Sequence, residues 1–179
     1  MSKLDSRRAY SGRVISLDVD TVNFPNGTVG ELEMVRHPGA SAIVPFLDDP
    51  SDRDPRILLI RQYRYAADSY LYEIPAGRLD PGESPEACAL RELKEETGYS
   101  AERIEPLTSF FTTPGFTDER IHIFMAMGLT GGIQALESDE IVELYPTPLS
   151  LAVDRVSSGE IVDGKSMIGI LLSARRIRA

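Results

Sequence analysis

The sequence contains one cysteine, two histidines and no tryptophan in 179 residues. The lone cysteine, Cys88, excludes an intramolecular disulfide and is typical of a reducing compartment, so we expect a cytoplasmic protein. His37 and His122 lie far apart without an HExxH motif, so a zinc site of histidine and cysteine has too few ligands. The apolar stretch 167–172 is interrupted by Gly169 and is far too short to span a bilayer, so no membrane partner is expected.

Basic residues are also scarce. The chain has 19 Lys and Arg against 28 Asp and Glu, which gives a formal net charge of −9. An acidic surface repels the phosphates of nucleic acids and anionic membranes, so neither is expected as a partner. A small phosphate ligand stays compatible with this charge if a metal ion or local arginines neutralise it. The length and the 42% content of hydrophobic residues are ordinary for a globular protein.

Apolar and polar residues alternate over residues 15–19 and again around Leu32 and Met34, on either side of an Asn-Gly turn signal. The first forty residues are therefore expected to form a small antiparallel β domain, 1–40. Beyond it, the pattern predicts strands at 42–47, 56–63, 121–127 and 141–145, and helices at 85–97, 149–157 and 165–177. Because strands alternate with helices, residues 41–179 are expected to form an α/β (α+β) domain, a mixed sheet with helices on its faces.

The helix expected over residues 85–97 has clear end signals. Ser84 is a good N-cap, a proline occupies the first helical position, and Gly98 suits the position just beyond the last turn. The face expected to pack into the core consists of Ala89, Leu90 and Leu93. A neighbouring face carries acidic residues.

Three carboxylates lie on one stripe of this helix. At about 100° per residue, Glu92, Glu95 and Glu96 fall within about one third of the circumference, where like charges repel each other. One interpretation is a solvated surface helix, in which Arg91 or Lys94 screens the acids. The other is a cation bound among them, and oxygen-only ligands of this kind suit Mg²⁺ or Mn²⁺.

The acidic stripe belongs to a longer pattern with fixed spacing. It runs Gly77, five residues, Glu83, seven residues, Arg91-Glu92-Leu93, one residue, Glu95-Glu96, one residue and Gly98. This pattern resembles the Nudix box, and only Tyr99 departs from it, at a position that is usually aliphatic. Gly77 permits a tight turn, and the forked guanidinium of Arg91 can hold Glu83 by two hydrogen bonds. The resemblance implies a Nudix α/β/α sandwich fold and a hydrolase of nucleoside diphosphates linked to another group.

Segments outside the box resemble the ADP-ribose pyrophosphatase branch of the family over nearly the whole chain. They are residues 61–64 (Arg-Gln-Tyr-Arg), 71–77 (Leu-Tyr-Glu-Ile-Pro-Ala-Gly) and 112–119 (Thr-Thr-Pro-Gly-Phe-Thr-Asp-Glu), with Pro114 sixteen residues beyond Gly98. The resemblance implies that Mg²⁺, with Mn²⁺ as an alternative and more than one ion bound, supports cleavage of ADP-ribose to AMP and ribose 5-phosphate. It also implies that residues 1–40 pair two subunits into a homodimer and contribute to the adenine side of the site.

The resemblance assigns metal-binding roles in and beside the box. It places one metal on the backbone carbonyl of Ala76 and takes Glu92 and Glu96 as the principal carboxylate ligands. Glu95 assists them and is expected to contribute to catalysis. The residues expected to support the box are Gly77, Glu83, Arg91 and Gly98. Divalent ions held in this way would neutralise a diphosphate, orient it and activate a water.

The resemblance also implies a set of substrate-binding residues, namely Arg64, Arg78, Glu33, Gly115 and Glu119. Arg64 matches an arginine that holds the diphosphate, and Glu33 matches an acidic residue that reads the adenine edge. Glu119 and the turn at Gly115 match a loop that touches the ribose phosphate. Without the resemblance, Arg64 fits a surface cation, Glu33 a solvent-facing strand residue and Glu119 a loop cap. Since no tryptophan can stack on adenine, Phe24, Tyr10 or an aliphatic residue would have to do so.

The catalytic base is expected on the acidic loop 137–140. The resemblance favours Glu137 under one alignment and Glu140 under another, and Asp139 is then a further metal ligand. The alternative for any one of them is a solvated loop acid. As a base, the residue takes a proton from a metal-bound water that attacks a phosphorus of the diphosphate.

Two other functions remain open from the sequence. The same chemistry could serve another nucleoside diphosphate sugar, such as GDP-mannose. A ligand-sensing Nudix domain could instead bind ADP-ribose without cleaving it, but such sensors tend to lose box glutamates or carry a DNA-binding domain. This chain keeps every glutamate of the box and has no basic patch, which favours the hydrolase.

Overall fold

The structure, a computed structural model, describes residues 1–136 and 141–178. Its contacts divide the chain into two compact units. The first consists of Met1–Gly39 and Phe110–Ile121, and the second of Ala40–Ser109 and His122–Ala179. The sequence does not indicate that segment 110–121 belongs with the N-terminal residues. The predicted domain limits, 1–40 and 41–179, stay a prediction, because a division by contacts does not show that either part folds alone.

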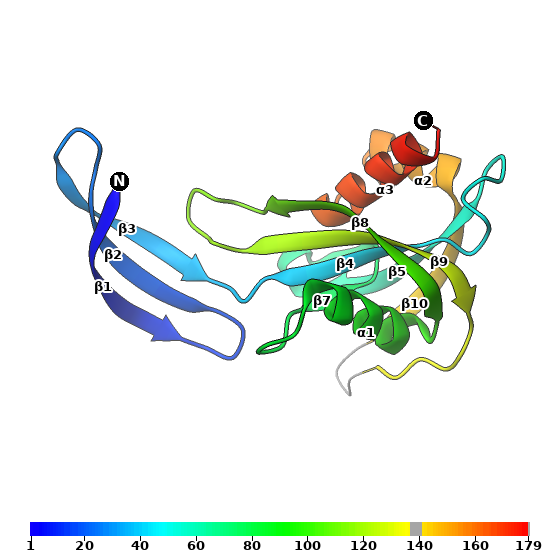
Figure 1. Cartoon of the computed structure of the whole chain (residues 1–179), viewed down its shortest axis with the longest axis horizontal. Coiled ribbons are helices and arrows are strands. Elements are labelled where there is room, and N and C mark those ends of the chain that lie inside the picture. Colours follow the sequence, from blue (N-terminus) through cyan, green and yellow to red (C-terminus); the bar gives the residue numbers. More distant parts are fainter. Residues whose placement is uncertain (137–140, 179) are drawn as a thin grey trace. The chain divides into compact units, whose positions relative to one another are not determined.

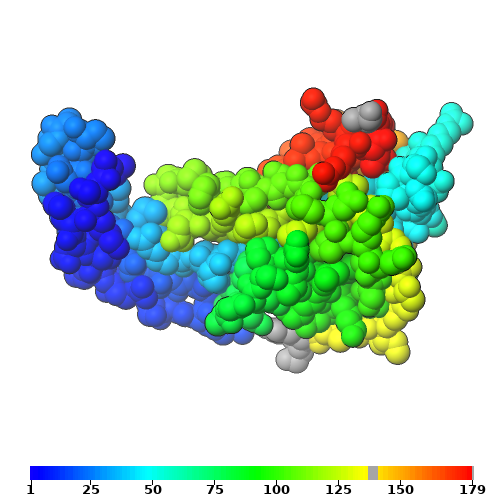
Figure 2. Space-filling model, viewed as in Figure 1, coloured from blue at the N-terminus to red at the C-terminus, as the bar shows by residue number. Residues whose placement is uncertain are grey.

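The first unit contains a three-stranded antiparallel sheet in the order β1-β2-β3 (Figure 1). Its strands are β1 (Ser2–Ser11), β2 (Ser16–Asn23) and β3 (Val29–Arg36). The predicted N-terminal antiparallel sheet is confirmed, but the sequence does not predict β1. Every residue of β1 is exposed, and the strand lies at the surface in Figure 2. A strand exposed in this way has no buried face to generate an apolar alternation.

The buried face of β2 carries two aspartates beside the apolar Val22. Asp18 and Asp20 are only 8% and 6% exposed. Arg36 donates from Nε to Asp18 at 3.1 Å and also bonds Asp20, while Arg8 bonds Asp18 and Ser6 donates to Asp20 at 2.6 Å. The bond from Arg8 lowers the pKa of Asp18 and the bond from Ser6 lowers that of Asp20, against the opposing effect of burial. Ion pairs therefore stabilise this face of the sheet.

Segment 110–121 is tied to the end of β3 by backbone and side-chain bonds. Val35 N donates to Phe116 O at 2.8 Å, and Asp118 N donates to Val35 O at 3.3 Å. The Asp118 carboxylate accepts from His37 N at 2.9 Å and from Arg36 Nη1 at 3.2 Å. These bonds fix the loop that carries Gly115 and Glu119 within the first unit.

The second unit is built on two sheets, in the orders β10-β5-β6 and β7-β4-β9-β8. Their strands are β4 (Ala40–Pro45), β5 (Arg56–Arg64), β6 (Ser69–Glu73), β7 (Ala76–Arg78), β8 (Ser100–Phe111), β9 (Arg120–Thr130) and β10 (Val142–Pro148). The pairs β4–β7, β5–β6 and β5–β10 are antiparallel, whereas β4 and β9 run in the same direction in Figure 1. The predicted mixed sheet is confirmed.

The strands of the second unit lie between helices, which are α1 (Pro85–Thr97), α2 (Leu149–Ser158) and α3 (Gly164–Ile177). Ile43 of β4 packs with Ala89 and Leu93 of α1. The next residue, Val44, lies close to Gly169 of α3. Because successive strand residues point to opposite faces, α1 and α3 cover opposite faces of β4, as Figure 1 shows. This is the predicted α/β/α sandwich. Because helices cover both faces of β4, its central residues are apolar on both sides of the strand.

Helix α1 has the bounds and both end signals that the sequence predicts. Ser84 accepts a hydrogen bond from Ala87 N at 3.2 Å, and Gly98, with φ of 76°, donates from its N–H to Lys94 O at 2.9 Å. The prediction that Leu90 packs into the core is wrong, because its exposed fraction is 37%. No helix in the described residues is long and apolar enough to cross a membrane.

Candidate active site

Gly77 of β7 lies directly against the carboxylate of Glu92 on α1. A Cβ at Gly77 would lie 1.8 Å from Glu92 Oε1 and 2.1 Å from its Cδ. These distances are too short for non-bonded atoms, so the Glu92 side chain would have to move. The sequence reasoning explained this glycine by a tight turn. The residues with positive φ do not include Gly77, so what a side chain at this position would disturb is the close approach of the Glu92 carboxylate.

A second carboxylate of the acidic stripe reaches the same piece of backbone. Ala76 N donates to Glu96 Oε2 at 2.9 Å, and Glu96 is only 3% exposed. Glu92 is likewise buried, at 9%. Two carboxylates from one turn of α1 therefore converge on Ala76 and Gly77, beside the carbonyl that the sequence analysis assigned to a metal.

Arg91 links this carboxylate pair to the loop before α1. Its Nε and Nη2 donate to the two oxygens of Glu83 at 2.9 and 3.0 Å, which is the two-bond contact expected from the sequence. Nη1 donates to Glu92 at 2.6 Å and to Glu95 at 3.0 Å, and Nη2 also donates to the carbonyl of Arg78 at 3.0 Å. The bonds from Arg91 lower the pKa of Glu83 to about 2, so this pair stays ionised at neutral pH.

The donor set of the box fits a hard divalent cation. Glu92, Glu95 and Glu96 offer only oxygen, and Mg²⁺ and Mn²⁺ prefer such ligands. Ala76, whose carbonyl is the further predicted ligand, binds Glu96 through its N–H. In the described residues, no group of three His, Cys, Asp or Glu side chains is arranged to hold a metal. The bonds explain this arrangement, because Glu92 and Glu95 are directed to Arg91, and Glu96 is directed to a backbone N–H.

Cys88 lies beside the charged residues of the box, and its Sγ accepts a hydrogen bond from Arg91 Nη2 at 3.5 Å. Its side chain is fully buried, and its Sγ lies 3.5 Å from the carbonyl oxygens of Gly77 and Arg78. Burial raises the pKa of the thiol to about 11, so it stays protonated and unreactive at neutral pH. The residue packs as a small apolar group.

Arg64, the predicted diphosphate ligand, is held by a carboxylate that the sequence reasoning did not single out. Its Nε donates to Glu73 Oε1 at 2.6 Å and its Nη2 donates to Glu73 Oε2 at 2.8 Å. Lys165 of α3 bonds the same carboxylate. Glu73 lies in a matched segment of the sequence, and the signal that could have revealed it is one charged residue next to the apolar Ile74 at the end of a strand.

The remaining predicted residues fall into three groups. Glu33 is an exposed residue of β3, and Gly115 and Glu119 lie on the loop of the first unit. Arg78 ends β7, in the second unit with the box. Glu137, Asp139 and Glu140 lie outside the described residues. The substrate and catalytic roles of all these residues stay predictions.

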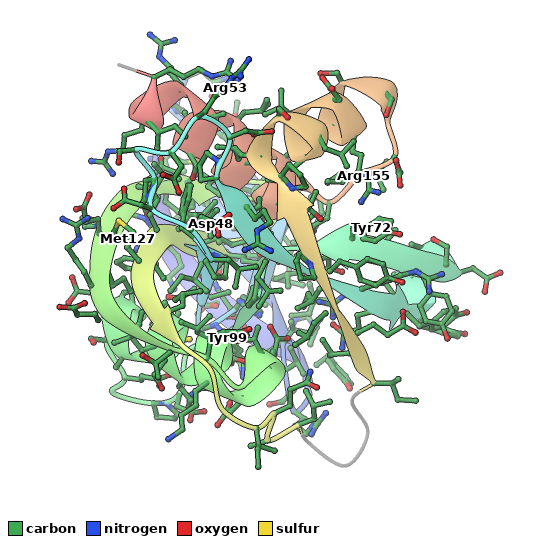
Figure 3. The ribbon with its side chains drawn as sticks, turned by 90° about the vertical axis from the view of Figure 1, so that its right-hand side faces the viewer. Asp48, Arg53, Tyr72, Tyr99, Met127 and Arg155 are labelled. Atoms are coloured by element: carbon green, nitrogen blue, oxygen red, sulfur yellow. The ribbon has the colours of Figure 1, made fainter. Side chains whose placement is uncertain are left out.

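Each unit also has a cavity away from the box. In the first unit, His37, Phe116 and Glu119 line a cavity of about 260 Å³, and His37 Nδ1 lies 3.4 Å from Glu119 Oε1. In the second unit, Asp48 and Met127, which are labelled in Figure 3, line a cavity of about 490 Å³. Residues of the box line neither of them.

Comparison with known proteins agrees with the sequence pattern. The model of the NUDIX domain family matches residues 36–161, and the chain therefore belongs to the Nudix family. It is 41% identical over 169 residues to a methanol dehydrogenase activator of Bacillus methanolicus, covering 93% of this chain and 89% of that protein. It is 40% identical over 163 residues to an ADP-ribose pyrophosphatase of Bacillus subtilis, covering 90% and 85%.

A solved structure shows the same fold. The crystal structure of an ADP compounds hydrolase superposes with a TM-score of 0.83 at 23% identity, covering 99% of this chain and 94% of that one. At this level of identity the likeness concerns the fold alone. It extends over both compact units and supports the Nudix architecture derived above.

Proposed function

We propose that this protein is a Mg²⁺-dependent pyrophosphohydrolase that cleaves the diphosphate of ADP-ribose into AMP and ribose 5-phosphate. The observation that carries the proposal is the convergence of Glu92 and Glu96 on the backbone of Ala76 and Gly77. The similarity to an ADP-ribose pyrophosphatase over 90% of this chain supports the choice of substrate.

The resemblance assigns the roles of the residues, and their contacts support them. The carbonyl of Ala76 and the carboxylates of Glu92, Glu95 and Glu96 would hold the metal, and we propose more than one Mg²⁺, with Mn²⁺ as an alternative. A bound divalent cation supplies charge neutralisation for the diphosphate and an acidified water. Arg91 holds the box loop to α1 through Glu83. Glu92 and Glu95, which bond its Nη1, would have to turn from it to hold a cation.

The substrate and the base are assigned by the resemblance. Arg64 holds the diphosphate and Arg78 binds near it, and Glu33, Gly115 and Glu119 are the residues proposed for the adenine and ribose ends. The base is Glu137 or Glu140, with Asp139 as a further ligand. Full turnover of both Glu137→Gln and Glu140→Gln at saturating Mg²⁺ would contradict this assignment of the base.

We also propose that the protein is a homodimer, paired through its first unit. The support is that β1 is exposed along its whole length and that Leu4, Tyr10 and Val29 are exposed apolar residues of this sheet. A sheet edge and apolar side chains left in water favour association. A monomeric mass in light scattering would contradict the proposal. A cytoplasmic location stays an expectation from the single cysteine.

Three alternatives differ from this proposal in substrate or in activity. Another nucleoside diphosphate sugar, such as GDP-mannose, is the alternative substrate, because the chain has no tryptophan to stack on adenine. The relative described as a methanol dehydrogenase activator is 41% identical, which makes activation of such a dehydrogenase a second candidate function. An assay of methanol dehydrogenase activity, with and without this protein, tests the second candidate function. A rise in dehydrogenase activity would support it. A sensor without catalysis would bind ADP-ribose and form no product.

The role of the acidic stripe is tested with a matched pair of variants on α1. Glu96→Gln removes a charge from the buried stripe, whereas Glu86→Gln makes the same change on the exposed first turn. We expect Glu96→Gln to lower kcat with Mg²⁺ at least about 100-fold. The variant would bind Mg²⁺ less well, and the negative charge of the transition state would then lack its counter-ion. Glu86→Gln should retain the activity of the wild type. Equal activities in the two variants would contradict the proposed metal site.

A further inference from the structure

Glu73 is a charged residue in an almost fully buried position. It ends β6, it is 1% exposed, and it lies three residues before Ala76. A carboxylate is costly to bury unless it is paired and hydrogen-bonded. The partners of the Glu73 carboxylate therefore indicate its role.

The first partner of Glu73 is Arg64, at the end of the neighbouring strand β5. A guanidinium has five N–H groups in a fixed plane. Glu73 takes the Nε–H and one Nη2–H, at 2.6 and 2.8 Å. This leaves three N–H groups on the outer edge of the plane, and the Arg64 side chain is 41% exposed. Arg64 is thus fixed along its inner edge and presents its outer edge.

The second partner of Glu73 comes from the first turn of α3. Lys165, whose side chain is 12% exposed, bonds Glu73 and also lies 3.0 Å from Asp163, the N-cap of α3. In the same turn, Ser166 Oγ accepts a hydrogen bond from Ile74 N at 2.8 Å. The α3 turn therefore holds both the Glu73 carboxylate and the backbone that leads to Ala76.

The charges around Glu73 keep its carboxylate ionised at neutral pH. Burial alone would raise its pKa, but the bonds from Arg64 and the charge of Lys165 outweigh burial, so its pKa lies below its ordinary value. Glu73 thus acts as an acceptor and does not exchange protons near neutral pH. Arg64 is also subject to the negative charge of Glu96, a proposed metal ligand. The guanidinium of Arg64 therefore interacts electrostatically with one carboxylate of the box.

We propose that Glu73 and Lys165 are positioning residues that hold the guanidinium of Arg64 ready for a phosphate of the substrate. The inference rests on the proposed function, because it takes the diphosphate as the ligand of Arg64. An arginine with one edge already bound loses little side-chain freedom when its other edge binds a phosphate. The α3 turn couples this arginine to the backbone of the metal site, so both parts of the site keep a fixed spacing.

The test uses Glu73→Gln, in which an amide nitrogen replaces one of the two acceptors. We expect KM for ADP-ribose to rise about tenfold and kcat to fall less than about threefold, since uniform binding is lost. Affinity for the α,β-methylene analogue of ADP-ribose and for inorganic pyrophosphate, measured by calorimetry with Mg²⁺, should fall by the same factor. Asp48→Asn is the matched control, because it disrupts another two-bond carboxylate pair, with Arg56, away from the box.

A double-mutant cycle shows whether Glu73 acts through Arg64. Arg64→Ala should weaken binding strongly in the wild type and much less in Glu73→Gln, because the two changes share one interaction. Additive effects would overturn the inference. If Glu73→Gln does not fold, Lys165→Met carries the test, with an expected loss of affinity of about threefold that Lys165→Arg restores. Unchanged affinity in Lys165→Met would overturn it as well.

The outcomes separate this inference from the proposed function. If the wild type binds the pyrophosphate probe but does not cleave ADP-ribose, the proposed function fails and the affinity ratios still decide the inference. If the wild type cleaves ADP-ribose and Glu73→Gln binds the analogue equally well, only the inference fails. A wild type that binds neither probe overturns both.

Discussion

Gly77 controls how closely the acidic stripe approaches the backbone of β7. Its missing side chain makes room for the Glu92 carboxylate, and the adjacent Ala76 N–H binds Glu96. The residue matters here for space, since its φ is not positive. At the scale of single residues, the geometry of the box therefore depends on a contact that a pattern of spaced letters does not describe.

Gly77→Ala is expected to displace Glu92, because the new Cβ would lie 1.8 Å from Oε1. We expect kcat/KM to fall at least about tenfold, since even a small misplacement of a site residue is costly, while far-UV circular dichroism stays unchanged. Gly164→Ala is the control, because a Cβ there meets nothing within 4 Å. Wild-type kinetics in Gly77→Ala would contradict the role of this close approach.

The pair of Asp48 and Arg56 predicts a dependence of stability on pH. The bonds from the Arg56 side chain and backbone lower the pKa of Asp48 from 3.8 to about 2. Since the folded pKa is depressed, the pair stabilises the fold above about pH 4, and this contribution is lost as the pH falls toward 2.

We expect Asp48→Asn to lower the free energy of unfolding by about 1 kcal/mol at pH 7, with a difference that shrinks below about pH 4 and vanishes only below about pH 2. Urea unfolding at several pH values measures it. The same substitution at the exposed Asp52, on the same loop, should show no such trend. A difference that grows on acidification would have the wrong sign.

Helix α1 shows what can and cannot be predicted at the scale of elements. Its bounds follow from Ser84 and Gly98, because capping is a local property of the sequence. Leu90 was assigned to the core by its apolar character, but its exposure depends on which tertiary partners cover the helix. The sequence does not predict strands β1 and β8, because neither strand contains a buried residue that would produce a clear apolar alternation.

Helix α3 packs closely on the sheet at Gly169. A Cβ there would lie 3.0 Å from both Ile74 and Val44, so a larger side chain must push α3 away. We expect Gly169→Leu to lower the free energy of unfolding by about 1–3 kcal/mol, as overpacking does. Gly164→Leu, in open space on the same helix, is the control, and denaturant unfolding measures both. Equal stabilities in the two variants would contradict this packing.

At the scale of the whole molecule, the negative charge is concentrated in the box. Residues 77–99 contain six acidic and three basic residues, a net charge of −3 out of −9 for the chain. The acidity that argues against polyanionic partners is therefore in part a site for cations. Arg91 neutralises only part of it, since it contacts the carboxylates of Glu83, Glu92 and Glu95.

Cation binding is expected to stabilise the folded protein. Saturating Mg²⁺ adds a binding free energy that the unfolded chain does not gain, about 2.7 kcal/mol at 100 times Kd. This corresponds to a rise in Tm of about 5–10 °C for a chain of this length. Glu96→Gln should show a much smaller rise, and Na⁺ at equal ionic strength should give none. The same Mg²⁺ shift in wild type and Glu96→Gln would contradict a metal site on the stripe.

The sequence predicted the class of fold, α1 and the box contact between Arg91 and Glu83, because these depend on local spacing and motif. It did not predict the anchoring of Arg64 by Glu73 and Lys165. Glu73 and Lys165 are 92 positions apart in the sequence, and only the packing of α3 on the sheet brings them together. Nor did it predict that Asp18 and Asp20 occupy buried positions of β2, since their counter-ions come from other strands.

A competition between substrates tests directly whether the protein prefers ADP-ribose. An equal mixture of ADP-ribose and GDP-mannose is incubated with the protein and Mg²⁺, and ³¹P NMR follows the products. We expect AMP and ribose 5-phosphate to form first, at a rate well above that of GDP-mannose cleavage, and EDTA to abolish both reactions. Faster cleavage of GDP-mannose, or ADP-ribose left intact, would contradict this expectation.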